Sequence, residues 1–210
     1  MEVITRENWN NIFQEISELM ISNKALLTEI DAKFGDGDHG ITIEKIAHTI
    51  QSKANEWAHS ELPLKSLFLE VGEGVTNING GSAGPLYGTY FEGLGEELND
   101  EVDTDAVLLK QILQSGLTEL QYLSTAKVGD KTMMDTLIPA TEAAVSAADD
   151  IISIVTAAKE AAIKGSENSK NFISKYGRAK SYKEKTIGTP DAGAQSCTYI
   201  FIGFYNALTK

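Results

Sequence analysis

The sequence predicts an all-α protein, a bundle or barrel of about eight helices. Apolar residues recur at spacings of three and four along most of the 210-residue chain, which is the period of an amphipathic helix. The alternating pattern of half-buried strands is missing, apart from short ambiguous stretches such as 199–204. Neither an internal repeat nor a Pro-rich linker divides the chain, so residues 1–210 are expected to form a single domain.

The first helix is predicted from an apolar stripe that begins at Trp9 and ends at Met20. Its expected length is about 15 to 20 residues, and Thr5 and Asn8 offer side-chain oxygens that can cap its N-terminus. A second helix is predicted over 41–50, after a glycine-rich break.

Six further helices follow from the same periodicity. Proline is tolerated in a first helical turn, so the fourth helix is expected to begin near Gly84-Pro85. Pro139 lies inside a helical pattern and is expected to bend or end the helix locally. In chain order, these helices are predicted over 64–71, 84–94, 107–120, 134–147, 149–164 and 192–208.

Composition excludes several classes of protein. The net charge of -12 opposes a general polyanion-binding role, so nucleic acid is not expected as a partner. Cys197 is the only cysteine, which excludes an intrachain disulfide and a Cys-rich zinc site and suits a reducing compartment. No apolar run approaches the roughly 20 residues of a membrane span, and the N-terminus lacks a signal-peptide pattern. We therefore expect a cytoplasmic protein.

Basic residues are concentrated in one segment. Six of the 18 cationic side chains lie between Lys170 and Lys185, where Glu184 is the only acid. This segment is either a flexible surface loop or a lid over an anion. A run of seven acids over 92–105 is interpreted as a solvated helix end and loop.

Three carboxylates within eight residues predict a metal site. Asp31, Asp36 and Asp38 are interspersed with glycines, and carboxylates packed this densely repel one another unless a cation neutralises them. Hard oxygen ligands favour Mg²⁺ or Ca²⁺ over zinc. An EF-hand is rejected, because a loop that began at Asp36 would lack the required glycine and glutamate. The two commonest nucleotide-binding loops, G-x-x-x-x-G-K-[ST] and G-x-G-x-x-G after a strand, are absent.

Four glycine-containing loops each lead into a predicted helix. They cover 35–40, 79–88, 129–135 and 188–194. Free N–H groups at a helix N-terminus suit a phosphate, so together the loops suggest a phosphate-bearing ligand at one mouth of the helical barrel. Taken alone, the 79–88 loop would instead indicate close helix packing at Gly84 and Gly88.

The motifs GDGDHG, GGSAGPLYGTYF, GDKTMMD, GRA and DAGA, in this order, resemble the ADP-binding L subunit (DhaL) family of bacterial dihydroxyacetone kinases. The resemblance covers nearly the whole chain. It implies an antiparallel eight-helix barrel with the nucleotide at one end, and two Mg²⁺ ions held by Asp31, Asp36 and Asp38. The sequence departs from the family pattern at Thr42, where Asn is usual, and at Ala192, where Pro is usual.

The resemblance also implies a set of ADP or ATP contacts. Arg178, at the phosphates, is the one residue expected to have a catalytic role, and Met133 is expected against the adenine. The full set of expected nucleotide contacts is His39, Gly40, Ile41, Thr42, Gly81, Ser82, Ala83, Ala126, Met133, Arg178, Asp191, Ala192 and Gly193.

The activity that the resemblance implies is a phosphoryl relay. ADP would take a phosphoryl group from the phosphohistidine of an M subunit and give it to dihydroxyacetone on a K subunit. Three alternatives stay open: an ATP-dependent kinase subunit for dihydroxyacetone or a related ketose, a regulatory nucleotide-binding module, and a helical scaffold without a site. A homodimer is also compatible with the sequence.

Overall fold

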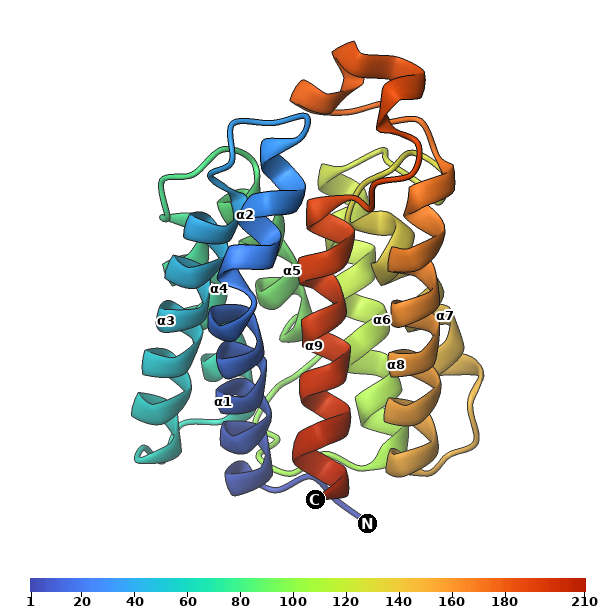
Figure 1. The fold of residues 1–210 in the computed structure, drawn as a ribbon. Coiled ribbons are helices and arrows are strands. Elements are labelled where there is room, and N and C mark those ends of the chain that lie inside the picture. Colours follow the sequence, from blue (N-terminus) through green and yellow to red (C-terminus); the bar gives the residue numbers. More distant parts are fainter.

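The computed structural model describes residues 1–210 and contains nine α-helices and two 3-10 segments, with no β-strand (Figure 1). All eight expected helices are present. The helices are α1 (Arg6–Ser22), α2 (Lys24–Ala32), α3 (His39–Ala58), α4 (Leu64–Thr76), α5 (Ala83–Leu94), α6 (Ala106–Leu123), α7 (Met134–Ser146), α8 (Ile151–Asn168) and α9 (Ala192–Thr209), and the 3-10 segments are η1 (Ser169–Asn171) and η2 (Arg178–Thr186).

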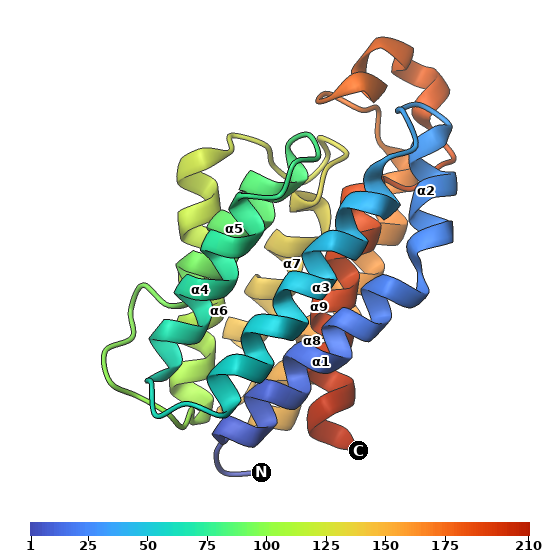
Figure 2. The same ribbon diagram turned by 90° about the vertical axis from the view of Figure 1, so that its left-hand side faces the viewer.

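Helix α2 was not expected from the sequence. It follows α1 after a break at Asn23 and buries only Leu27 and Ile30, so its apolar stripe is too short to stand out. It packs on α3 and α9 beyond the end of α1 (Figure 2).

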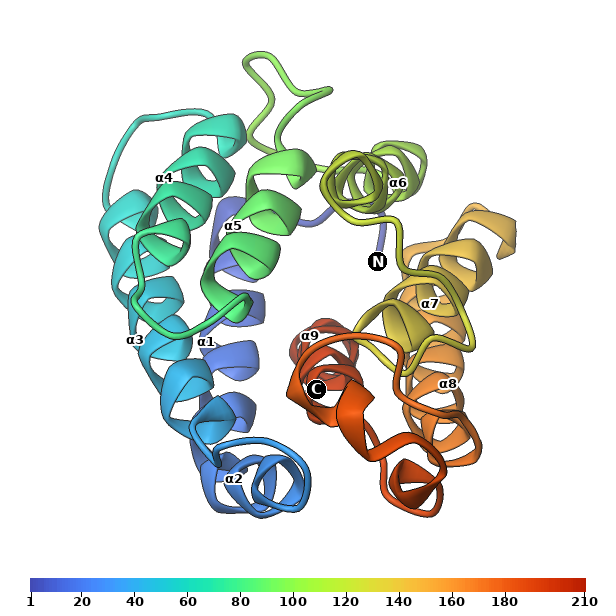
Figure 3. The same cartoon turned by 90° about the horizontal axis from the view of Figure 1, so that it is seen from above.

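Eight of the helices form a closed ring. Each of α1, α3, α4, α5, α6, α7, α8 and α9 packs on the next, and α9 returns to α1 (Figure 3). Consecutive members run antiparallel, so the N-termini of α3, α5, α7 and α9 lie at the same end (Figure 1). The expected antiparallel eight-helix barrel is confirmed. Its shape brings the four glycine loops together, because each loop precedes one of these N-termini.

A continuous core of 45 buried apolar residues fills the barrel. Trp9 of α1 packs edge-on against Phe68 of α4 and Phe204 of α9, with ring centroids 5.2 and 5.6 Å apart. The Trp9 indole nitrogen also donates a hydrogen bond to Thr104 Oγ1 at 3.0 Å. These contacts join the N-terminal and C-terminal helices. They lie in the half of the barrel that is away from the glycine loops.

Local signals explain where the helices begin. Thr5 accepts a hydrogen bond from the backbone N–H of Asn8, whose side chain accepts one from the backbone N–H of Thr5, so the predicted capping of α1 is confirmed. Asp105, Asp150 and Asp191 cap α6, α8 and α9 by accepting the backbone N–H three residues further on, without the reciprocal bond.

Pro139 does not end α7, which continues to Ser146. The missing N–H leaves the carbonyl of Asp135 without its helical partner. That carbonyl and the proline ring face Gly165 of α8, where a Cβ atom would lie 3.1 Å from Pro139 Cγ. Gly165 therefore lets α7 and α8 approach closely. None of the helices is both long and apolar enough to cross a membrane.

Candidate functional site

The four helix N-termini surround one cavity of about 780 Å³, a size typical of small-molecule sites. Fourteen of the sixteen residues predicted for the site line this cavity. They are Asp31, Asp36, Asp38, His39, Thr42, Gly81, Ser82, Ala83, Ala126, Met133, Arg178, Asp191, Ala192 and Gly193.

The other two predicted residues, Gly40 and Ile41, do not line the cavity. Gly40 lies against α2, where a Cβ atom would collide with the carbonyl oxygen of Lys24 and the hydroxyl of Thr28. The Ile41 side chain is 45% exposed on the outer face of α3. Gly40 therefore acts as a packing position in this structure.

The three aspartates of the first loop gather their carboxylates in one place. Oxygen atoms of Asp31, Asp36 and Asp38 all lie within 4.8 Å of one another. Asp31 Oδ2 accepts backbone N–H groups from Gly37 at 2.9 Å and His39 at 3.4 Å, which folds the loop around this carboxylate. The turn requires the positive φ of 75° at Gly37, a conformation that glycine adopts without strain.

Electrostatics supports a cation among these carboxylates. Burial, with a further contribution from the neighbouring Asp36, raises the pKa of Asp38. Three oxygen-donor side chains this close together fit the preference of Mg²⁺ for hard ligands. The donor set therefore suits the divalent ion that the sequence predicts.

The basic segment extends from the end of α8 to this aspartate loop (Figure 1). It folds into the 3-10 turns of η2, and an Arg178 guanidinium nitrogen lies 2.7 Å from Asp36 Oδ2. The rings of Tyr182 and Phe34 pack with centroids 5.3 Å apart. Of the two interpretations that the sequence left open, the lid is the one that these contacts favour.

Arg178 is only loosely held. Its side chain is 70% exposed, and an exposed ion pair of this kind contributes little to stability. The guanidinium can therefore leave Asp36 for an anion in the cavity without a large cost.

The loop before α5 contacts the first turn of α3. Gly80 lies against Thr42, and a Cβ atom at Gly80 would be 2.7 Å from Thr42 Cγ2. Next to it, Ser82 and Ala83 form the first turn of α5. The close packing of α5 on α4 at Gly84 and Gly88 is also present, so the packing interpretation of this loop is confirmed, and its phosphate-binding role stays a prediction.

His39 forms a hydrogen-bond chain that the sequence did not predict. Its Nε2 lies 2.8 Å from Ser196 Oγ in α9, which in turn lies 2.8 Å from the hydroxyl of Tyr87 in α5. Burial lowers the pKa of His39, which favours the neutral ring. Tyr87 and Ser196 lie within or next to glycine motifs, but only the closed barrel brings them to His39.

The loop before α7 is organised by Asp135, which is buried. Its carboxylate accepts backbone N–H groups from Gly129 at 2.6 Å and Thr132 at 2.7 Å, which places Met133 at the cavity wall. Burial raises the pKa of Asp135.

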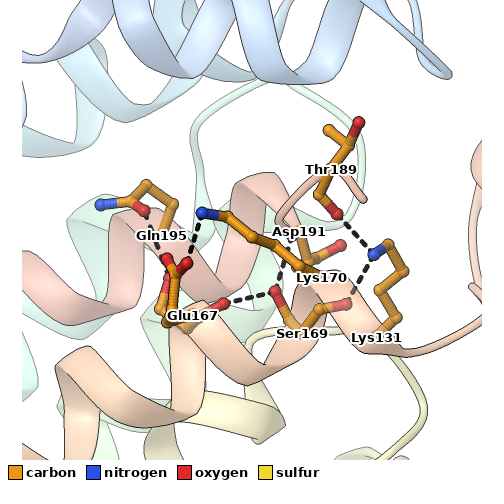
Figure 4. A network of polar contacts seen from close by, with 8 residues as sticks. Lys131, Glu167, Ser169, Lys170, Thr189, Asp191 and Gln195 are labelled. Atoms are coloured by element: carbon orange, nitrogen blue, oxygen red, sulfur yellow. Dashed lines mark hydrogen bonds and ion pairs between the residues drawn. The ribbon is translucent and has the colours of Figure 1, made fainter. Parts of the chain in front are cut away.

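Asp191 caps α9 beside the Met133 loop and accepts the N–H of Ala194 at 2.9 Å. Burial raises the pKa of Asp191 to about 7. Its own backbone N–H donates to Ser169 Oγ at 2.9 Å (Figure 4). Sequence reasoning selected Asp191 but missed Lys131 and Ser169, whose contacts join segments far apart in the chain.

The arrangement can bind a metal ion and a polyanion side by side. Helix N-termini favour negative charge, the carboxylates favour a divalent cation, and Arg178 adds a mobile positive charge beside both. Apolar residues that line the cavity, among them Leu86, Leu123 and Met133, can pack against a flat ring.

Comparison with known proteins agrees with this geometry. The DAK2 domain family model matches residues 33–206. The "PEP-dependent dihydroxyacetone kinase 1, ADP-binding subunit DhaL" of Listeria innocua is 30% identical over 195 residues, which cover 92% of this chain and 90% of that subunit. The "L-erythrulose kinase" of Pectobacterium atrosepticum is 31% identical over 186 residues, 87% of this chain and 32% of the kinase.

A solved structure has the same fold. The dihydroxyacetone kinase from C. freundii, in complex with AMP-PNP and Mg²⁺, matches 94% of this chain with a TM-score of 0.71 and 27% identity. This chain covers 33% of that kinase. It therefore spans about nine-tenths of the Listeria subunit and about a third of the larger kinases.

Proposed function

This chain belongs to the DAK2 domain family, and we propose that it is the ADP-binding subunit of a phosphoenolpyruvate-dependent dihydroxyacetone kinase. The observation that carries the proposal is the near-complete mutual coverage with the Listeria ADP-binding subunit, 92% of one chain and 90% of the other. The fourteen predicted residues around one cavity add geometric support.

Asp31, Asp36 and Asp38 would hold two Mg²⁺ ions, and the walls of the cavity would hold the nucleotide. When bound, the metal neutralises phosphate charge and polarises the transferring group. Ser82 and the first turn of α9 would provide N–H groups for the phosphates, and Thr42 would provide its hydroxyl, because its N–H is bonded to the Asp38 carbonyl at 3.0 Å. Met133 would provide an apolar contact for the adenine.

The proposed reaction is a relay in two transfers. The P–N bond of a phosphohistidine on the M subunit breaks as a bond forms between phosphorus and a β-phosphate oxygen of ADP. The new terminal P–O bond then breaks as a bond forms to a hydroxyl of dihydroxyacetone on the K subunit, which also takes the hydroxyl proton. Such transfer needs positioning and charge neutralisation, which Arg178 and the helix N-termini can provide.

This chain needs no nucleophile of its own for the relay. Cys197, its one thiol, is buried in the core, and burial raises the pKa of that thiol. The K and M subunits are accordingly the proposed partners, and the cytoplasm is the proposed location, where such phosphotransfer proteins act.

Nucleotide release tests the proposal. The protein is purified in Mg²⁺ and denatured, and the supernatant is analysed for nucleotide by chromatography. ADP in near-equimolar amount, or tight binding of added ADP, is the expected result. Absence of both would overturn the proposal. Asp36→Ala is expected to reduce Mg²⁺-dependent retention, whereas a helical scaffold without a site would be unaffected.

A second candidate is a kinase subunit that exchanges ATP freely. The AMP-PNP complex of the C. freundii kinase favours it. Turnover with ATP but not with phosphoenolpyruvate and the upstream phosphotransferase proteins would support this candidate. Fast release of bound nucleotide would also support the ATP-exchanging kinase subunit.

A further inference from the structure

Lys131 is a buried cation at the wall of the cavity. Lys131 is only 3% exposed and lies in the loop that leads into α7. Its backbone has a φ of 62°, in the left-handed region that few residues other than glycine adopt. A buried lysine in this conformation is held by its surroundings, and such positions gather at functional sites.

The ammonium group joins two separate segments. Lys131 Nζ donates hydrogen bonds to the carbonyl oxygens of Ser169 and Thr189, each at 2.6 Å (Figure 4). Ser169 begins η1, directly after α8, and Thr189 lies just before α9. Burying an ammonium is costly unless it is hydrogen-bonded, and charge-assisted bonds are the strong ones. The two carbonyls are therefore held firmly.

The contact continues to the start of α9. Ser169 Oγ donates to the carbonyl of Ser166 at 2.6 Å and accepts the backbone N–H of Asp191 at 2.9 Å (Figure 4). Asp191 in turn caps α9 through the N–H of Ala194. A continuous chain of hydrogen bonds thus leads from Lys131 to the first turn of α9.

We propose that Lys131 is a positioning residue that sets the distance between the two walls of the nucleotide pocket. One wall includes Met133, two residues after Lys131, and the neighbouring wall is formed by 190–193, where a Cβ atom at Gly193 would lie 3.4 Å from Met133 N. The segment before the second wall contains Gly188, whose φ is 91°. Its backbone donates from Gly188 N–H to the Lys170 carbonyl at 2.7 Å and from Thr189 N–H to the Thr186 carbonyl at 3.4 Å, so these bonds tie it to η1 and η2. The ammonium adds a bond from this segment to the loop before α7. The inference rests on the proposed function, because it concerns the same nucleotide.

The test compares two lysines of one network. Lys131→Met removes the ammonium and keeps the length of the side chain. Lys170→Met is the matched control, because the Lys170 side chain pairs with the exposed Glu167 at 2.5 Å (Figure 4). The Lys170 carbonyl, which accepts the Gly188 N–H, is kept in this variant. ADP binding in Mg²⁺ is measured by calorimetry on the full chain, and amide exchange of residues 189–195 is followed by mass spectrometry.

Lys131→Met is expected to raise the Kd for ADP by about tenfold or more and to speed exchange of the Asp191 and Ala194 amides. Lys170→Met is expected to change the Kd by less than about twofold. A purely structural role would lower Tm but leave the Kd of the folded protein unchanged. An unchanged Kd in folded Lys131→Met, or an equal rise in both variants, would overturn the proposal.

Ser169→Ala keeps the inference testable if Lys131→Met does not fold. This change removes the acceptor of the Asp191 N–H but leaves the Lys131 contacts in place. It is expected to raise the Kd for ADP by about threefold to tenfold, and no change would contradict the inference. If the unaltered protein binds no ADP, the proposed function fails as well. If the unaltered protein binds ADP and the variants bind it with the same Kd, only the role of Lys131 fails.

Discussion

The contact between Gly80 and Thr42 predicts that Gly80→Ala weakens ADP binding. Gly80 is in the loop before α5, and Thr42 is in the first turn of α3, so the two residues join adjacent walls of the cavity. The added Cβ would overlap Thr42 Oγ1 and would lie 2.7 Å from Thr42 Cγ2 and 3.1 Å from Thr42 Cβ. Thr42 is only 3% exposed, so its side chain has little room to turn away.

The size of the effect follows from the displacement required. Ordinary van der Waals contact begins at 3.4 Å, so relieving the Cγ2 contact alone requires a separation of roughly 0.7 Å, and clearing the overlap with Oγ1 requires more. Overpacking of this kind costs about 1–3 kcal/mol, which corresponds to about 5-fold to 150-fold in affinity if the cost falls on the bound state. Gly80 does not have a positive φ, so backbone strain does not add to this cost.

The assay is calorimetric titration of ADP in Mg²⁺, on Gly80→Ala, Thr42→Ala and the double variant. Removing the methyl and hydroxyl of Thr42 opens space for the new Cβ, so the double variant is expected to bind more tightly than the sum of the single effects predicts. A coupling of about 1 kcal/mol or more would confirm the contact. An unchanged Kd in Gly80→Ala, or strictly additive effects, would refute the reasoning.

Three further predictions concern stability. Gly165→Ala gains about 1 kcal/mol of helix propensity, but its Cβ collides with the carbonyl of Asp135. We expect a net loss of about 1–2 kcal/mol in the free energy of unfolding, seen as a Tm lower by about 2–8 °C in a circular dichroism melt. Gly74→Ala, which meets only a threonine methyl, is the control, and an equal loss there would point to another cause. Asp38→Asn relieves repulsion in the aspartate loop, so the Tm of this variant in EDTA should equal or exceed that of the unaltered protein. Addition of Mg²⁺ should raise the Tm of the variant less than that of the unaltered protein. Because burial raises the pKa of Asp191 to about 7, the native state keeps a proton that the unfolded chain releases above about pH 4. Stability to urea should therefore fall as pH rises from about 4 to 7, and Asp191→Asn should show a smaller fall.

Helix positions and chemical types could be predicted from the sequence because they depend on neighbours in the chain. The 3.6-residue period located the eight barrel helices, and oxygen-bearing residues marked where α1 begins. The aspartate loop was recognisable because three carboxylates lie within eight residues. Helix α2 escaped prediction, since only two of its residues are buried and the break at Asn23 has no strong signal.

Contacts between distant segments depended on the fold. His39 meets Ser196 across 157 positions of sequence, and Lys131 meets Thr189 across 58. No local pattern records such a pairing, because it exists only once the ring of helices has closed. The same holds for Arg178, whose basic segment could be a free loop or a lid until its contact with Asp36 favoured the lid.

The sequence by itself thus determined the helical class and the four helix starts that can face an anion, and it predicted a metal site in the aspartate loop. Tertiary structure confirmed that these starts share one cavity, and it alone decided that Gly40 and Ile41 lie outside the cavity and that Lys131 bonds to Ser169 and Thr189. The physical reason is the distance along the chain over which each interaction acts. Periodicity, capping and charge density act within one or two helical turns, whereas a cavity is made by side chains that the packed core brings together.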